Sequence, residues 1–304
     1  MGTKLPTVFI DGEAGTTGLQ IRQRLAGLPL SLISLDHARR KDPTARRDAM
    51  AESDITILCL PDEAAREAVQ MATRLQSNAP KLIDASSAHR TDPAWAYGFP
   101  ELSREQPSAI ATASKVSNPG CYATGAIALL RPLKHANIIP AHHPITISAI
   151  SGYTGGGRNM IEHHEKHAGP AFEYYALDLT HKHLPEIQKH SGLECAPIFI
   201  PSVGHFPQGM MVTIGLHAKS LPHAKTAAEL CKIYEFHYAG TNIKILPSPP
   251  TRPLADALAN TDDLEIAVYE SEKTGDLLLW ARLDNLGKGA SGAAVQNLKL
   301  MLGW

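Results

Sequence analysis

The chain has 304 residues, with 29 lysines and arginines against 30 aspartates and glutamates, and a net charge of −1 at pH 7. This balance excludes the strongly basic surface by which proteins bind nucleic acids or anionic membranes, so we expect neither partner. Hydrophobic residues make up 43% of the chain, which is typical of a globular protein and excludes extensive disorder. The length is sufficient for two ordinary domains.

The apolar runs and the cysteines indicate where the protein works. No apolar run approaches the roughly 20 residues of a transmembrane helix, and Met1–Pro6 lacks the apolar region of a signal peptide. The four cysteines are too few and too scattered for a disulfide scaffold or a paired-cysteine zinc site. We therefore expect a soluble protein of the cytoplasm.

The N-terminal part, residues 1–117, alternates short apolar runs with helical patterns. Continuous apolar strands separated by helices are typical of a parallel sheet that is buried on both faces. The sequence therefore predicts an α/β, Rossmann-like dinucleotide-binding domain. Its predicted strands are 7–10, 30–35, 54–60 and 81–85.

Residues 118–285 show a different pattern. A helix is predicted over 123–135, and the later apolar runs alternate with period two, which is typical of antiparallel strands buried on one face. We predict an α+β domain with a largely antiparallel sheet. Residues 286–304 contain a helical pattern whose apolar stripe needs a partner, and we expect it to complete the N-terminal domain. The alternating runs are 210–216, 264–268 and 277–281.

The segment Asp11–Gly18, DGEAGTTG, follows a predicted strand and opens a helix. Its G-x-x-G-x-x-G spacing is a variant of the dinucleotide fingerprint, in which glycines let the backbone approach a pyrophosphate at a helix N-terminus. The alternative is a tight turn without a ligand. At the end of the second predicted strand, Asp36 would bind a ribose 2′-hydroxyl, whereas Arg39 and Arg40 would accept a 2′-phosphate. We favour NADP, and the alternative is a solvated basic loop.

The segment Asn118–Pro119–Gly120 forces a turn immediately before a predicted helix. Cys121 would then lie at a helix N-terminus, where the dipole and the free amide groups favour a thiolate. The alternative is a small buried residue at a helix start. Cys59, inside a predicted strand, is expected to be a core residue.

Two further segments carry candidate site residues. Ser151–Arg158, SGYTGGGR, combines glycine amides with one arginine, which suits a phosphate or a carboxylate, although a surface hairpin is an equal alternative. His181 and His183 would share a side of an extended chain. No third ligand completes a metal site there, so we expect no metal and interpret an imidazole as an acid and base beside a thiolate. The pair His163–His164 is expected at the surface.

Taken together, these segments resemble N-acetyl-gamma-glutamyl-phosphate reductase in its shorter form. The resemblance extends in order over nearly the whole chain, and Glu13, Thr16, Lys182 and Leu184 depart from the commoner long form. The matching motifs are VFIDGEAGTTGLQIRQRL (8–25), ASSAHR (85–90), YGFPEL (97–102), NPGCY (118–122), SGYTGGGR (151–158), HKHLPEI (181–187) and DNLGKGASGAAVQ (284–296).

The resemblance implies an NADPH-dependent reduction of N-acetyl-gamma-glutamyl phosphate to its semialdehyde in arginine biosynthesis, through a cysteine thioester. It also implies the architecture of aspartate-semialdehyde dehydrogenase and a homo-oligomer, either a dimer or a tetramer. Cys121 matches the nucleophile and His181 the acid-base residue, with His183 close by. The implied cofactor contacts are Gly12, Gly15, Thr16, Thr17, Gly18, Arg39, Arg40 and Asn285. The implied substrate or phosphate contacts are Arg90, Asn118, Ser151, Gly152, Arg158, His183 and Glu186.

Several alternatives stay open at this point. The substrate could be aspartyl phosphate or an N-acetyl-aminoadipyl phosphate, with the same chemistry. The chain could instead be a non-catalytic NADP-sensing protein, although the presence of both Cys121 and His181 argues against this. A Cys-His hydrolase would leave the glycine loop unexplained.

Overall fold

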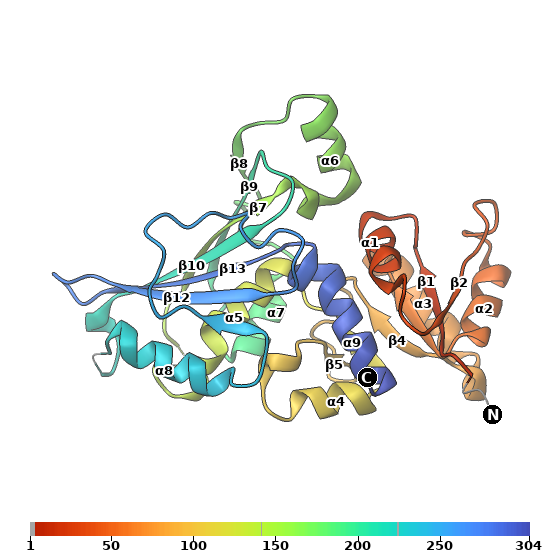
Figure 1. Ribbon diagram of the computed structural model, residues 1–304, viewed down its shortest axis with the longest axis horizontal. Coiled ribbons are helices and arrows are strands. Elements are labelled where there is room, and N and C mark those ends of the chain that lie inside the picture. Colours follow the sequence, from red (N-terminus) through yellow and green to blue (C-terminus); the bar gives the residue numbers. More distant parts are fainter. Residues whose placement is uncertain (1–3, 141, 224) are drawn as a thin grey trace. The chain divides into compact units, whose positions relative to one another are not determined.

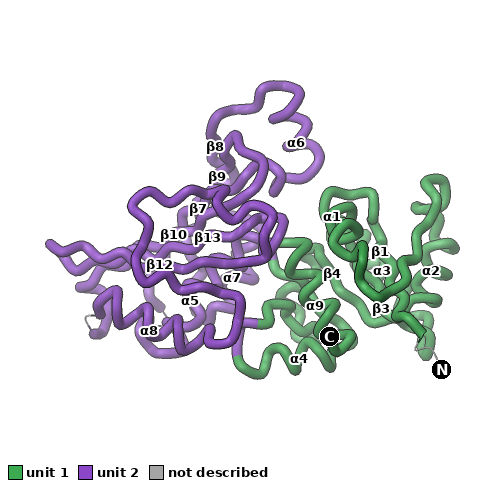
Figure 2. Tube along the Cα trace, in the orientation of Figure 1, with its two compact units in different colours: residues 1–100, 104–119, 290–304 green, residues 101–103, 120–289 purple. Residues whose placement is uncertain are grey.

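The computed structural model describes residues 4–140, 142–223 and 225–304. The first three residues, which belong to the segment without an apparent signal peptide, lie outside the described residues. None of the described helices is long and apolar enough to cross a membrane. The chain divides into two compact units (Figure 2): unit 1 consists of Met1–Pro100, Arg104–Pro119 and Ala290–Trp304, and unit 2 of Glu101–Ser103 and Gly120–Gly289.

Unit 1 alternates strands and helices along the chain, as the sequence predicts (Figure 1). Its strands form one parallel sheet in the order β2-β1-β3-β4-β6-β5. The strands are β1 (Thr7–Asp11), β2 (Ser31–Ile33), β3 (Ile55–Leu58), β4 (Lys81–Asp84), β5 (Ala96–Tyr97) and β6 (Lys115–Ser117). The helices are α1 (Thr16–Leu25), α2 (Pro43–Glu52), α3 (Asp62–Thr73), α4 (Gln106–Thr112) and α9 (Gly292–Leu302).

The sheet of unit 1 is buried on both faces because successive side chains of a strand enter two separate cores. Val8 and Ile10 of β1 belong to a core that also contains side chains of α1, α4 and α9. Phe9 belongs to a second core with side chains of α2 and α3. The C-terminal helix supplies Leu298, which is fully buried, to the first core.

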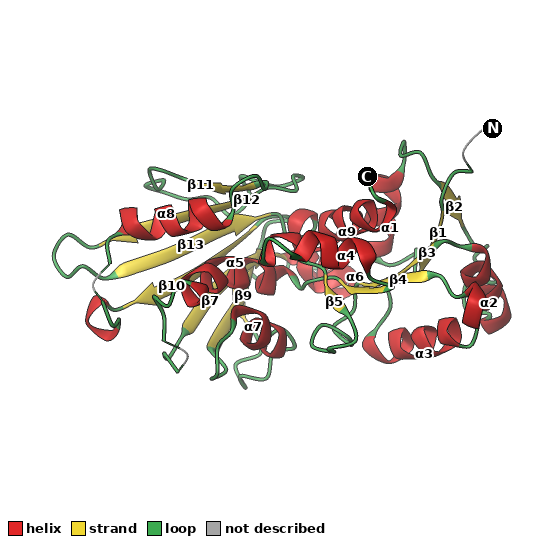
Figure 3. Ribbon diagram, turned by 90° about the horizontal axis from the view of Figure 1, so that it is seen from below, coloured by secondary structure: helices red, strands yellow, loops and turns green. Residues whose placement is uncertain are grey.

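Unit 2 contains a seven-stranded sheet with helices beside it (Figure 3). Its strands are β7 (Thr146–Gly152), β8 (Phe172–Tyr174), β9 (Ile198–Gly204), β10 (Met210–Leu216), β11 (Ile243–Ile245), β12 (Leu264–Glu270) and β13 (Leu277–Leu283). Its helices are α5 (Cys121–His135), α6 (Gly157–Lys166), α7 (Leu184–Ser191) and α8 (Ala227–His237). The π-helical turn η5 (Gly287–Ser291) leads from unit 2 into α9.

The sheet of unit 2 has the order β11-β12-β13-β10-β7-β9-β8. The predicted, largely antiparallel sheet is confirmed, because four of the six strand pairings are antiparallel. The other two pairs, β7 with β9 and β11 with β12, are parallel, so the sheet is mixed. Period-two burial is the same in both kinds of pairing, so the sequence pattern could not separate them. The long connection from β7 to β9, which contains α6, β8 and α7, supplies the crossover that a parallel pair needs.

Helix α5 is buried along most of its length and packs against β10 and β13. Gly125 allows this close approach, since a Cβ there would lie 2.7 Å from a methyl group of Val212. Helices α7 and α8 also pack against α5 and form one helical layer with it. The helix begins at Cys121, two residues before the predicted start, and this places the thiol at its N-terminus.

Candidate active site

The glycine loop of unit 1 lies between β1 and α1, at the carboxyl end of the parallel strands. Gly12 has φ of +90°, and a Cβ there would collide with the carbonyl oxygen of Cys59. A Cβ on Gly18 would lie 2.6 Å from the carbonyl oxygen of Gly12, so this glycine lets α1 pack against the loop. Gly15 is the N-cap of α1, and Thr16 and Thr17 are the first two residues of that helix. The loop is therefore a bare backbone turn at a helix N-terminus, suited to a pyrophosphate.

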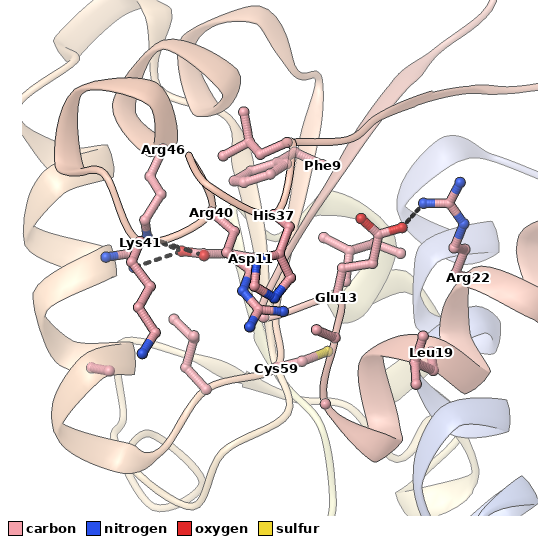
Figure 4. A pocket seen from close by; sticks show the side chains of 17 residues that line it. Phe9, Asp11, Glu13, Leu19, Arg22, His37, Arg40, Lys41, Arg46 and Cys59 are labelled. Atoms are coloured by element: carbon pink, nitrogen blue, oxygen red, sulfur yellow. Dashed lines mark hydrogen bonds and ion pairs between the residues drawn. The ribbon is translucent and has the colours of Figure 1, made fainter.

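A cavity of about 660 Å³ opens at this loop (Figure 4). It lies where the sheet order passes from β2 on one side of β1 to β3 on the other, which is the usual ligand position in such sheets. The glycine loop and Cys59 line it, together with cationic side chains. These cations are Arg22, Arg40, Lys41 and Arg46. The cavity, the bare loop and the cations together fit a dinucleotide cofactor.

Two carboxylates near the loop are neutralised by arginines. Arg46 Nη2 donates to Asp11 Oδ2 at 2.7 Å, and its Nε donates to both carboxylate oxygens at 3.1 Å. Glu13 forms an ion pair with Arg22, whose Nη1 also donates to Ser34. These pairs remove the repulsion that two acids would exert on a pyrophosphate.

The basic segment after β2 enters the pocket in part. Arg40, Lys41 and His37 line the cavity, whereas Arg39 and Asp36 are not among its lining residues. Within the described part of the chain, neither the Arg40 nor the Lys41 side chain makes a hydrogen bond or ion pair. The two unpaired cations at the cavity wall suit a 2′-phosphate. The carboxylate of Asp36, which would bind a free ribose hydroxyl, does not line that wall.

Cys59 packs against the core that contains Val8 and Ile10, as predicted, and it also lines the pocket. Burial raises the pKa of its thiol, and the negative charges of Asp11 and Asp84 raise that pKa further. A thiol with a raised pKa is a poor nucleophile, so Cys59 does not compete with Cys121 as the reactive cysteine.

In unit 2, Cys121 is the first residue of α5 and is partly exposed. Gly120 caps the helix with extended backbone angles, and its N–H donates to Glu186 Oε2 at 3.2 Å. Glu186 is buried in the first turn of α7, and its Oε1 lies 4.0 Å from His183 Nε2. The structure thus brings Cys121, His183 and Glu186 together around one helix terminus.

The imidazole of His181 has one orientation defined by the backbone. The N–H of His183 donates to His181 Nδ1 at 3.1 Å, so the neutral ring carries its proton on Nε2. That Nε2 lies 3.4 Å from the hydroxyl oxygen of Tyr175. Both histidines are buried, and the Tyr122 ring packs against each of them. His181 therefore presents an N–H that can act as a proton donor.

Tyr175 is a site residue that the sequence interpretation missed. It follows β8, in a stretch where Phe172 and Tyr174 gave no sign that one aromatic residue differs from its neighbours. Burial raises the pKa of the Tyr175 hydroxyl, a hydrogen bond with Tyr122 opposes this, and the charge of a Cys121 thiolate raises the pKa as well. The pKa of Tyr122 is raised by burial, by Tyr175 and by Cys121. The two tyrosines are thus electrostatically coupled to the thiol.

Three further predicted residues, Ser151, Gly152 and Asn285, share one hydrogen-bond network in unit 2. Gly152 donates its N–H to Gly209, whose own N–H donates to Asn285 Oδ1 at 2.8 Å. The hydroxyl of Ser151 donates to the carbonyl oxygen of Gly152. Asn285 Nδ2 donates to Thr154. This network fixes the Gly-rich segment, and Arg158, in the first turn of α6, is exposed beyond it.

Arg90 and Asn118 belong to unit 1 and brace its backbone. Arg90 Nε donates to the carbonyl oxygen of Asn118 at 2.9 Å, and its Nη2 donates to that of Ala85. Asn118 Nδ2 donates to the carbonyl oxygen of Ala290, and its Oδ1 accepts from Asn297. Contact of Arg90 or Arg158 with phosphate stays a prediction.

No group of three or more potential metal ligands occurs among the residues that the structure describes. His181 and His183 lie with ring centroids 4.7 Å apart and nearly perpendicular, which suits packing of two imidazoles.

Comparison with known families matches both halves of the chain. Residues 9–110 match the NAD-binding domain of semialdehyde dehydrogenase, and residues 121–285 match the dimerisation domain of semialdehyde dehydrogenase. N-acetyl-gamma-glutamyl-phosphate reductase 2 of Pseudomonas putida is 50% identical, over 98% of this chain and 97% of that protein. N-acetyl-gamma-glutamyl-phosphate reductase of Burkholderia lata is 48% identical, over 98% and 96%.

Solved structures agree on the fold. Aspartate semialdehyde dehydrogenase II of Vibrio cholerae, complexed with ASA, superposes with a TM-score of 0.74 at 16% identity, over 99% of each chain. Aspartate semialdehyde dehydrogenase of Candida albicans, with NADP, gives a TM-score of 0.68 at 12% identity, over 98% of this chain and 99% of that one. At such identities the likeness concerns the architecture alone.

Proposed function

The chain belongs to the semialdehyde dehydrogenase family, and within it to the N-acetyl-gamma-glutamyl-phosphate reductases. From this premise we propose that it reduces N-acetyl-gamma-glutamyl phosphate to N-acetyl-glutamate semialdehyde, a step of arginine biosynthesis. The enzyme is an oxidoreductase of the NAD(P)-dependent class. The observation that carries the mechanism is Cys121 at the N-terminus of α5, in the same unit as the buried His181.

The reaction proceeds through a covalent intermediate on Cys121. Its thiolate attacks the acyl carbon, the carbon–oxygen bond to phosphate breaks, and inorganic phosphate leaves behind an acyl thioester. When bound, NADPH supplies the hydride that reduces this thioester. His181 donates the Nε2 proton to the oxygen of the resulting thiohemiacetal. It takes that proton back as the carbon–sulfur bond breaks, and the aldehyde leaves.

Tyr175 orients the acid-base residue in this mechanism. Its hydroxyl is positioned at 3.4 Å from His181 Nε2, the nitrogen that carries the proton. Glu186 accepts a hydrogen bond from the N–H of Gly120 beside Cys121, and it lies near His183. We assign His183 and Glu186 to the binding and orientation of the substrate.

The preferred cofactor is NADPH. Arg40 and Lys41 line the pocket without partners in the described part of the chain, and they form the 2′-phosphate site of this proposal. Gly12, Gly15 and Gly18 hold the pyrophosphate on bare backbone, with Thr16 and Thr17 at the first turn of α1. Asn285 belongs to unit 2, and its place near the nicotinamide stays part of the proposal.

A homo-oligomer forms through unit 2. Helices α5 and α8 pack on one face of its sheet, and α7 packs against α5. The other face exposes apolar side chains such as Leu278 of β13 and Ile198 of β9, which are 40% and 50% exposed. A match to a dimerisation domain supports a second copy as the occupant of that face. We also place the protein in the cytoplasm, which the four free thiols support.

The direct test incubates the enzyme with the acyl phosphate in the absence of NADPH. Mass spectrometry is expected to find one acyl group on the peptide that contains Cys121, and later addition of NADPH releases the aldehyde. Rates with N-acetyl-glutamyl, aspartyl and N-acetyl-aminoadipyl phosphates define the substrate. A preference for either of the latter two, or no turnover with any of them, contradicts the proposal.

A further inference from the structure

An ion pair between Glu101 and Lys288 is buried inside unit 2. Lys288 Nζ donates to Glu101 Oε1 at 2.7 Å, and the two side chains are only 1% and 2% exposed. Transfer of both charges out of water is costly, and such a pair is often no more stabilising than apolar side chains of similar volume. Stability alone therefore does not account for a charged pair at this place.

Lys288 lies in the π-helical turn η5, between two glycines whose backbone is closely packed. A Cβ on Gly287 would collide with the carbonyl oxygen of Thr261. A Cβ on Gly289 would lie 2.8 Å from the Cβ and 3.2 Å from the Cα of Cys121. The backbone of this turn therefore packs directly against the proposed nucleophile. π-helical turns are rare in proteins, and those that do occur are often found at functional sites.

Each partner of the ion pair is also held by its surroundings. The N–H of Gly289, next to Lys288, donates to the carbonyl oxygen of Asp284 at 2.9 Å. Asp284 is fully buried, and its carboxylate accepts from the N–H groups of Asn260 and Leu286. The carbonyl oxygen of Glu101 lies 3.3 Å from His237 Nε2 of α8. The ion pair thus connects the backbone fixed by α8 to the turn that covers Cys121.

We propose that Glu101 and Lys288 are positioning residues for Cys121: their ion pair holds η5 so that Gly289 restricts the cysteine side chain to the rotamer from which its sulfur attacks. The inference rests on the nucleophilic role of Cys121 proposed above. A displacement of about 1 Å of a reacting group can cost ~10²-fold in rate, so a loose turn would lower kcat with little effect on substrate binding.

Two variants separate positioning from stability. E101Q leaves the buried ammonium beside a neutral amide, and both Tm and kcat are expected to fall. E101L/K288M removes both charges, so its Tm recovers toward the wild-type value. Its kcat is expected to stay ~10- to 100-fold low, because the connection to η5 is still missing. KM for the acyl phosphate and Kd for NADPH are expected to change by less than about twofold.

The second readout is the rate at which iodoacetamide alkylates Cys121 as a function of pH. Mass spectrometry of the peptide that contains Cys121 measures it. In E101L/K288M the profile is expected to move to higher pH, because a sulfur in another rotamer loses its place at the helix N-terminus. The matched control is E265Q, which breaks the ion pair of Glu265 with Arg282 between β12 and β13. E265Q is expected to lower Tm and to leave the alkylation profile unchanged.

Recovery of kcat together with Tm in E101L/K288M would overturn the proposal, and so would an equal shift of the alkylation profile in E265Q. If the double variant does not fold, E101Q is measured well below its own Tm, and a wild-type kcat and profile there overturn the proposal equally. Failure of the proposed function looks different: the wild-type enzyme would then form no acyl thioester on Cys121.

Discussion

The pocket of unit 1 and the catalytic cluster of unit 2 are assembled in different ways. In unit 1 the proposed pyrophosphate site is one continuous loop, whose backbone would be the binding surface because glycines leave it bare. In unit 2 the cluster consists of side chains from separate segments, Cys121 on α5, Tyr175 after β8 and His181 before α7. Substitutions in unit 1 should therefore act on cofactor affinity, and those in unit 2 on the chemical step.

The largest effect is expected for Cys121→Ser. A neutral hydroxyl is a far weaker nucleophile than a thiolate, so kcat should fall by ~10³-fold or more. The Kd of NADPH, measured by fluorescence titration, should stay unchanged because the pocket belongs to unit 1. Wild-type turnover in this variant would falsify covalent catalysis.

A smaller loss of kcat, on the order of 10²-fold, is expected for His181→Asn, which removes the proton donor. His183→Asn is the matched comparison two residues away and should cost less. Tyr175→Phe removes a single hydroxyl, and about a five- to tenfold loss is expected from the lost orientation of His181. Steady-state rates decide the order, and a larger loss in His183→Asn would move the acid-base role to His183.

In unit 1, the double substitution Arg40→Ser and Lys41→Ser should raise KM for NADPH by ~10- to 100-fold, since each cation makes a charge-assisted contact to phosphate. KM for NADH should change little. Arg39→Ser is the control, because Arg39 does not line the pocket. An equal rise for both cofactors would contradict a 2′-phosphate site.

The smallest effect concerns acid stability, and we expect it in unit 2. His164, expected at the surface, is buried, stacks on Tyr153, and its Nδ1 lies 2.9 Å from that of His205. Burial lowers the pKa of His164, as do His205 and His163, while Glu173 opposes them. The contribution of neutral His164 to stability is therefore complete above about pH 6.5, the pKa of a histidine in the unfolded chain. It is lost as the pH falls through the lower pKa of His164 in the folded protein.

Thermal melts of the wild type and His164→Gln from pH 7.5 to 5 measure this contribution. The wild-type Tm should fall more steeply below about pH 6.5 than that of the variant, whose residue 164 does not titrate. Parallel curves for the two proteins would show that His164 does not couple folding to protons.

Features encoded by local sequence were predictable, and features set by pairing across the fold were not. The glycine loop and the helix that starts at Cys121 follow from turn and helix signals within a few residues. Lys41 lines the pocket and Arg39 does not, because the direction of exposed side chains after β2 depends on how that loop folds. Local sequence carries no information on such directions.

Contacts between distant residues explain the other differences. Glu101 and Lys288 are 187 positions apart, so no pattern could join them. Tyr175 approaches the histidines because β8 pairs with β9, and this pairing also brings the N–H of Tyr175 to the carbonyl oxygen of Pro201. The parallel partners β7 and β9 alternate in burial as antiparallel strands do, and only the crossover distinguishes them.

The position of α9 has a consequence for synthesis on the ribosome. Its side chains Ala294, Leu298 and Met301 share a core with Ile21 of α1 and with β1 residues, all of which are synthesised long before α9. In most proteins the N-terminal domain folds first during synthesis. This chain cannot follow that order, because the core of unit 1 needs α9. Unit 2 ends at Gly289 and can therefore fold before α9, which unit 1 needs for its core, has been synthesised. The cofactor pocket is thus expected to mature last, after α9 has been synthesised.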